Sequence, residues 1–286
     1  MADFLQDVQT ELFLLRKRVS TWVVLAVWLV LAICFAYVFP YISYRSNGAE
    51  GGPAAGGGGT DLATLLPGQL VPTVIGGFAF YGGALALILG VLTFGSEFGW
   101  NTWKTLFTQR PGRMRIVFAK VAALGLGLLP FAIGVFVVGG VASLIIAGVE
   151  GASMSGPSPV SLAEAILAGW FTLAVWAAIG VMLAVITRGT SLAIGIGILY
   201  ALVIEGTISV FGNSISWLKP IVEGFMRANA YSLVEPLGTS GNAENGGPGG
   251  FSGPFVDPLQ AFVVLALYLV IFLGISVWLM RRRDIA

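Results

Sequence analysis

Six long apolar segments in a chain of 286 residues constrain this fold more than any motif does. A helix needs about 20 mostly apolar residues to cross a bilayer, and each segment reaches or exceeds that length. Hydrophobic residues make up 57% of the sequence and charged residues only 10%, which leaves too little polar surface for an ordinary soluble domain. The sequence therefore predicts an all-α membrane protein with a single transmembrane domain over 1–286. The expected spans are about 19–39, 70–94, 116–148, 162–187, 191–211 and 259–280.

The positive charges are distributed unevenly around these segments. An even number of spans places both termini on one side, and twelve of the fifteen Lys and Arg residues fall on that side. Because loops rich in Lys and Arg stay in the cytosol, we expect both termini to be cytoplasmic in a multi-pass protein of the cell membrane. Orientation alone accounts for these short basic runs, so they do not indicate nucleic-acid binding. The residues on the other side are Arg45, Lys219 and Arg227.

The numbers of cysteine and histidine residues limit the kinds of disulfide, metal site and catalytic site that the chain can contain. Cys34 is the single cysteine and lies inside the first apolar segment, so no disulfide within the chain can form, and we interpret Cys34 as a packing residue. The sequence contains no histidine, the commonest metal ligand and general base. We expect no catalytic, metal or cofactor site in this chain.

Residues 1–18 precede the first span and have helical periodicity. Phe4, Val8, Leu12 and Leu15 recur on one face, and Asp3, Gln6, Asp7, Thr10 and Glu11 occupy the other. This pattern predicts an amphipathic helix in the membrane surface, with a solvated tail as the alternative. Arg16, Lys17 and Arg18 would then reach the lipid headgroups.

Two outer loops and several small residues complete the organisation. Residues 48–59 are almost entirely Gly and Ala, which predicts a flexible tether. The segment 215–226 predicts one or two short apolar helices before the last span, interrupted by Pro220 and too short to cross the bilayer. Pro130 predicts a kink in the third span. Small residues four apart predict close helix packing in the second and fifth spans: Gly82, Ala86, Gly90, and Ala193, Gly197, Ala201.

The connection between the second and third spans carries the most distinctive pattern. Residues 97–113 predict a short helix that Pro111 ends, with Trp100, Trp103 and Phe107 on one face. Two tryptophans on an exposed helix indicate a protein docking surface. The alternative is an aromatic belt that anchors the helix to the membrane.

This connection resembles the membrane subunits of type-2 ATP-binding-cassette (ABC) exporters. In that family the second span ends in a Glu, and a short helix, a Pro and a basic residue follow; here these are Glu97, Thr102, Pro111, Arg113 and Lys120. The N-terminal run from Glu11 to Arg18 resembles the family's surface helix, and the six-span layout extends the likeness over the whole length. The resemblance implies that the connection is a coupling helix pressed against a separate ATPase. The residues expected at that contact are Glu97, Trp100, Trp103, Lys104, Phe107 and Arg113.

By the same resemblance, the chain is the permease subunit of an ATP-driven exporter that moves an amphipathic or lipophilic solute out of a prokaryotic cell. It implies a cytosolic ATPase that binds ATP and Mg, a second permease copy or paralogue, and contact with membrane lipid. None of the four lysines follows a glycine, so the chain lacks the phosphate-binding loop of a motor and is not itself an enzyme. The alternatives are an ion-gradient-driven secondary transporter or a membrane scaffold without transport.

Glu205 is the one carboxylate well inside an expected span, and it continues the Ala193, Gly197, Ala201 face. A charge in lipid costs at least about 2.5 kcal/mol on insertion scales, so Glu205 is expected to face protein or a wet cavity. Its role is either cation contact or gating, or a structural hydrogen bond near the outer interface.

Overall fold

The computed structural model describes residues 2–47, 61–100, 102–103, 113–211, 215, 217–238 and 256–282. Every regular element in these ranges is helical, and six of the helices are long and apolar enough to cross a membrane. The prediction of an all-α multi-pass membrane protein is therefore confirmed. The six helices run over Val19–Ser46, Pro67–Gly99, Met114–Glu150, Pro159–Thr187, Ser191–Ile208 and Pro258–Arg282.

Several of these spans are built from more than one element. The first contains α2 (Val19–Ile33), η1 (Cys34–Val38) and α3 (Phe39–Asn47), and the second contains η3 (Pro67–Gln69), α4 (Leu70–Gly77), η4 (Phe78–Gly82) and α5 (Gly83–Gly99). The third contains α7 (Arg113–Gly127) and α8 (Leu129–Glu150), the fourth is α9 (Pro159–Thr187), the fifth contains α10 (Ser191–Ile198), η5 (Leu199–Ile204) and α11 (Glu205–Phe211), and the sixth is α15 (Pro258–Arg282). The segments η1, η4 and η5 are π-helical. The remaining elements are α1 (Ala2–Lys17), η2 (Leu62–Leu65), α12 (Lys219–Glu223), α13 (Met226–Val234) and η6 (Glu235–Leu237).

The second and fourth spans form the centre of the bundle. In each of these two spans, 67% of the most apolar stretch of 18 residues is buried inside the protein. The corresponding share is 22% in the first and fifth spans and 17% in the sixth. Glycine permits this contact, because a Cβ on Gly90 would lie 2.2 Å from the Ala177 carbonyl oxygen and a Cβ on Gly180 would lie 2.2 Å from the Leu87 carbonyl oxygen. The backbones of α5 and α9 therefore touch, and the predicted role of Gly90 in close packing is confirmed.

The third span changes helix at Leu128, as Pro130 predicts. Proline lacks the N–H that would continue the hydrogen-bond ladder, and it falls in the first turn of α8, where that loss costs little. Two indoles bond to carbonyls on either side of the break. Trp170 donates to the Gly125 oxygen at 2.8 Å, and the buried Trp28 donates to the Phe131 oxygen at 2.9 Å.

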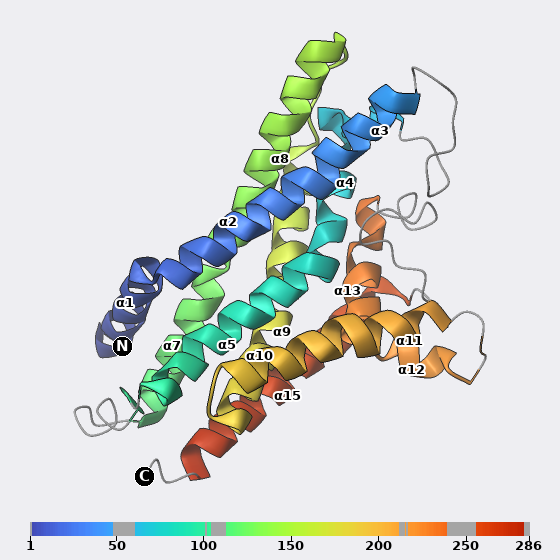
Figure 1. Ribbon diagram of the computed structural model, residues 1–286. Coiled ribbons are helices and arrows are strands. Elements are labelled where there is room, and N and C mark those ends of the chain that lie inside the picture. Colours follow the sequence, from blue (N-terminus) through green and yellow to red (C-terminus); the bar gives the residue numbers. More distant parts are fainter. Residues whose placement is uncertain are drawn as a thin grey trace.

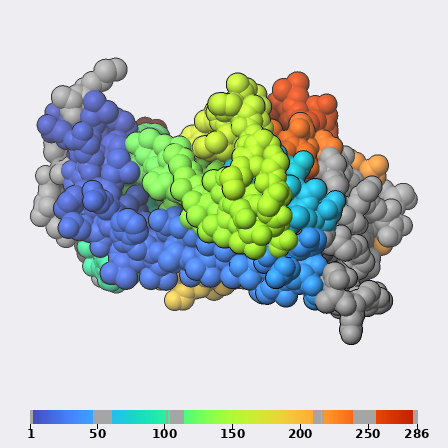
Figure 2. All heavy atoms as spheres, turned by 90° about the horizontal axis from the view of Figure 1, so that it is seen from above, coloured from blue at the N-terminus to red at the C-terminus, as the bar shows by residue number. Residues whose placement is uncertain are grey.

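The helix α1, the end of α5 and the end of α15 gather at one end of the bundle, at the lower left of Figure 1. Toward the other end lie α3, α12 and α13. Seen from above, the end of α8 (yellow-green) stands beside α2 and α3 (blue), which run along one edge of the molecule (Figure 2).

The N-terminal helix α1 packs against protein on its apolar face. Val8 and Leu15 are buried together with Ala119 and Ala123 of α7, and Phe4, Leu12 and Ala122 lie against them. Leu5, Phe13 and Leu14 are the exposed large apolar residues of α1. The predicted helix is present, but its regular apolar face contacts α7, and a different set of side chains is left for the membrane surface.

The segment 215–226, predicted to form one or two short apolar helices, contains α12 and only the first residue of α13. Pro220 does not interrupt them as expected, because it lies in the first turn of α12, where a missing N–H is tolerated. Phe225 has an extended backbone, with φ −70° and ψ 148°, and separates the two helices. The predicted glycine-rich tether at 48–59 lies outside the described residues.

Candidate functional site: a buried charge cluster around Glu97

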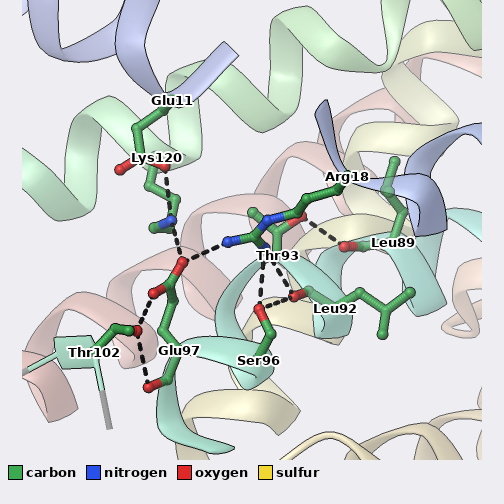
Figure 3. Close-up of polar contacts among 9 residues, drawn as sticks. All are labelled: Glu11, Arg18, Leu89, Leu92, Thr93, Ser96, Glu97, Thr102 and Lys120. Carbon is green, nitrogen blue, oxygen red and sulfur yellow. Dashed lines mark hydrogen bonds and ion pairs between the residues drawn. The ribbon is translucent and has the colours of Figure 1, made fainter. Parts of the chain in front are cut away.

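Glu97 lies in the last turn of α5 and is the centre of a buried charge cluster (Figure 3). Its Oε1 accepts hydrogen bonds from Arg18 Nη2 at 2.6 Å and from Lys120 Nζ at 3.1 Å. Its other carboxylate oxygen accepts from the Thr102 hydroxyl. We call Glu11, Arg18, Glu97, Thr102 and Lys120 the Glu97 cluster. The second span therefore ends in a carboxylate that already has three donors.

Lys120 connects Glu97 to the N-terminal helix. It is on α7, its side chain is 1% exposed, and its Nζ also donates to Glu11 Oε2 at 2.7 Å. The cluster thus holds two cations and two carboxylates, and their formal charges cancel. Buried charges are tolerated when they are paired and hydrogen-bonded, and the removal of one partner is costly. These contacts therefore fix the relative positions of α1, α5 and α7.

Arg18 joins the same cluster from the junction of α1 and α2. It has an extended backbone, with φ −74° and ψ 122°, which ends α1 and starts α2. Its Nη1 donates to Ser96 Oγ at 3.0 Å and to the Leu92 oxygen at 3.4 Å. The expectation that Arg18 reaches lipid headgroups is wrong, because the turn at this residue directs its guanidinium inward to Glu97 (Figure 3).

A second set of three charged residues joins α1 to α7. Arg115 Nε lies 2.7 Å from Asp7 Oδ2, and Arg115 Nη1 lies 3.6 Å from Asp3 Oδ2. Asp7 and Glu11, which the sequence places on the polar face of the helix, are buried, with 5% and 7% exposure. Asp7 and Glu11 are four residues apart and share a face of α1, and their partners Arg115 and Lys120 both come from α7. The four-residue spacing of the acids was visible in the sequence, but their partners were not.

The two tryptophans of the connection have opposite environments. Trp103 is 1% exposed, and its ring lies 5.9 Å from that of Phe94 and 5.7 Å from that of Phe98. The prediction that Trp103 belongs to an exposed docking face is therefore wrong: its indole packs on the last turns of α5. Trp100 is 67% exposed, and the Arg18 guanidinium lies 5.9 Å from its ring centre.

The other residues expected at the ATPase contact are described only in part. Lys104, Phe107 and Pro111 lie outside the described residues, as does most of the predicted coupling helix. Arg113 begins α7. Of the residues around the connection that carry the resemblance, Glu97, Thr102 and Lys120 meet in the cluster, and Glu11 and Arg18 join them from the N-terminal run.

Glu205 forms a second buried polar site, near the other end of the bundle. It is 0% exposed and accepts hydrogen bonds from the Tyr200 hydroxyl at 2.6 Å, the Met226 N–H at 2.9 Å and the Arg227 N–H at 3.0 Å. The prediction that Glu205 faces protein is confirmed. Three donors point at the carboxylate, and donors repel a cation, so this geometry favours a structural hydrogen-bonding role over cation contact.

Arg227 is buried beside Glu205 among aromatic rings. Its guanidinium lies 4.8 Å from the ring centre of Phe80 and 5.8 Å from that of Tyr231. Burial raises the pKa of the Tyr231 hydroxyl, and the positive charge of Arg227 opposes that rise. The hydroxyl therefore stays protonated at neutral pH.

The two buried polar sites differ in charge but are both filled by hydrogen bonds. In the part of the chain that the structure describes, no group of three or more Cys, Asp or Glu side chains could hold a metal ion. The Glu97 cluster pairs each carboxylate with a cation, and Glu205 is occupied by donors. Both arrangements hold helices together.

The fold defines an all-α multi-pass membrane protein. The family model described as "Protein of unknown function (DUF2705)" matches residues 73–286, and the chain belongs to this family. The matched region includes Glu97, Lys120 and Glu205 but begins after Glu11 and Arg18. A search of curated proteins found no match.

Proposed function

We propose that this protein is the permease subunit of an ATP-driven exporter of the type-2 ABC class, and that it moves an amphipathic or lipophilic solute out of the cytoplasm. Six membrane-spanning helices and the residues Glu97, Thr102, Pro111, Arg113 and Lys120 support this proposal. ATP and Mg would be bound by a separate cytosolic ATPase. A second copy of the chain or a paralogue would complete the membrane part.

The Glu97 cluster is the observation that carries the proposal. The connection to the third span starts after Gly99, two residues beyond Glu97, and Thr102 within it donates back to the Glu97 carboxylate. Arg18 and Lys120 tie the same carboxylate to the start of α2 and to α7. A displacement of the connection would therefore be transmitted to three helices at once, because charge-assisted hydrogen bonds are short and directional. That transmission is what a permease needs from a coupling element.

The proposed orientation places the Glu97 cluster at the cytosolic end of the bundle. Its support is the distribution of Lys and Arg, with twelve of fifteen on this side of the spans. A cytosolic ATPase could reach the cluster only in this orientation. Within the described part of the connection, Trp100 is the large apolar side chain available for such a contact.

The experiment is ATPase binding by two tryptophan variants of the full chain. Trp100→Ala removes an aromatic side chain that is 67% exposed beside the cluster, and Trp217→Ala removes one that is 69% exposed between α11 and α12. Loss of an interface tryptophan often costs about 2 kcal/mol, or roughly a 30-fold rise in Kd. We expect Trp100→Ala to release the ATPase that co-purifies with the wild type, and Trp217→Ala to retain it.

Equal retention by both variants, at equal membrane insertion, would refute the proposed coupling surface. Transport that depends on an ion gradient and persists without any ATPase would favour a secondary transporter. A chain that neither binds an ATPase nor transports would be a scaffold.

A further inference from the structure

We infer that Glu205 is a latch that holds the α12–α13 element against the fifth span, and that release of this carboxylate is the step that lets α13 move. The inference concerns the end of the bundle away from the Glu97 cluster and does not depend on the proposed function.

The latch consists of hydrogen bonds between elements separated in sequence. Glu205 begins α11, and its two carboxylate oxygens accept the first backbone N–H groups of α13, those of Met226 and Arg227. The first N–H groups of any helix lack partners within that helix, so a carboxylate is a strong acceptor at this position. No side chain on the preceding residue, Phe225, caps α13. Glu205 supplies the cap from another helix.

The chain around α13 is suited to move as one piece. Asn229 Nδ2 donates to the Glu223 oxygen at 2.8 Å and to the Phe225 oxygen at 2.7 Å, which fixes the corner between α12 and α13. Eight of the nine residues of α13 are buried, and Ala228, Ala230 and Ser232 are each 0% exposed, so the helix is covered on all sides in this state. A displacement of α13 would uncover part of this surface.

The fifth span provides a site where movement can start. It is among the least buried spans, and its π-helical segment Leu199–Ile204 ends immediately before Glu205. Such segments are frequent at functional sites, because the widened turn can revert to α-helix and rotate the residues that follow. A rotation of this kind would withdraw Glu205 from α13. Tyr200, within the π-helical segment, donates to the same carboxylate and would move with it.

Gly206 allows α11 to lie close to the Arg227 side chain. A Cβ at this position would lie 3.3 Å from Arg227 Nη1, so a larger residue would push the guanidinium away from α11. Arg227 also contacts Phe80 of η4, which extends the contact to the second span. The latch therefore joins the fifth span, α13 and η4.

The test measures how often α13 leaves its position. A cysteine replaces Ala230 in a Cys34→Ala background, and its reaction with a small methanethiosulfonate reagent is followed in the full chain in lipid nanodiscs. Ala230 is 0% exposed, so the reaction reports opening. Glu205→Ala is expected to raise the reaction rate at least about tenfold, the factor that corresponds to about 1.4 kcal/mol. Tyr200→Phe, which removes one donor and leaves the α13 cap in place, is expected to raise it less.

Two controls make the result decisive. Glu164→Ala removes an exposed carboxylate near the start of α9 and should leave the rate unchanged. Ser143→Cys, in α8, reports on a residue that is 0% exposed and distant in sequence from the latch, and it should stay unreactive in the Glu205→Ala protein. An unchanged rate at Ala230→Cys in Glu205→Ala would overturn the latch. An equal rise in the reaction rate at Ser143→Cys would also overturn it, since the faster reaction would then reflect a general loosening of the bundle.

Discussion

Replacement of Lys120 with methionine removes the cation shared by Glu11 and Glu97 while nearly preserving side-chain volume. The Lys120 side chain is 1% exposed, and its Nζ lies 2.7 Å from Glu11 and 3.1 Å from Glu97. Glu97 would keep Arg18 and Thr102, but Glu11, whose side chain is 10% exposed, would lose the partner that neutralises its carboxylate. Removal of one member of a buried pair costs about 3–5 kcal/mol, and we expect a loss in this range.

The assay is the free energy of unfolding of the purified protein in mixed micelles, measured by titration with a denaturing detergent. Lys219→Met is the matched control, because Lys219 pairs with Glu223 at 3.9 Å and is 56% exposed; a surface pair contributes about 0–1 kcal/mol. The double variant Glu11→Gln, Lys120→Met should lose less than the sum of the two single variants, with a coupling of about 0.5–3 kcal/mol. Additive losses, or a Lys120→Met loss no larger than that of Lys219→Met, would refute the account of the Glu97 cluster.

Three further predictions follow from the packing and the topology. Gly90→Ala would place a Cβ 2.2 Å from the Ala177 oxygen and should cost about 1–3 kcal/mol of stability by forcing α5 from α9, whereas Gly125→Ala, with open space around its Cβ, should be neutral or better in the same unfolding assay. Trp103→Ala should cost about 3–5 kcal/mol because the indole is buried, while Trp100→Ala should stay within about 0.5 kcal/mol of wild type; equal losses would contradict the assignment of Trp103 to the core. In intact cells, a cysteine at Ser46 should react with an impermeant reagent and one at Thr10 should not, and the reverse labelling would invert the proposed orientation.

The spans were predictable because insertion into a bilayer depends on length and composition, which a sequence states directly. The third span is the clearest case, since Pro130 predicted the change of helix that the structure has at Leu128. The contact between Gly90 and α9 followed from small-residue spacing, although the spacing did not name Ala177 as the partner. The orientation of the chain in the membrane stays a prediction.

The Glu97 cluster was not predictable as a whole, because its members come from three separate stretches of the chain: 11–18, 97–102 and the residue Lys120. The resemblance indicates Glu97, Thr102 and Lys120 and identifies the run from Glu11 to Arg18 as a surface helix, but it names no partner for Glu11, and the amphipathic pattern predicts that Arg18 reaches lipid. Both side chains instead meet protein groups, because α1 packs on α7. Trp103 was misplaced for a similar reason, since helical periodicity indicates which residues share a face and not what that face contacts.

The proposed exporter function is tested most directly by purification of the tagged wild-type chain from its native membrane in mild detergent, followed by mass spectrometry of every protein present in comparable amounts. The account predicts a cytosolic ATPase with a phosphate-binding loop, retained by the wild type and by Trp217→Ala and lost from Trp100→Ala. A preparation of the folded chain, with its helix content and unfolding transition intact, that contains no such ATPase would contradict it.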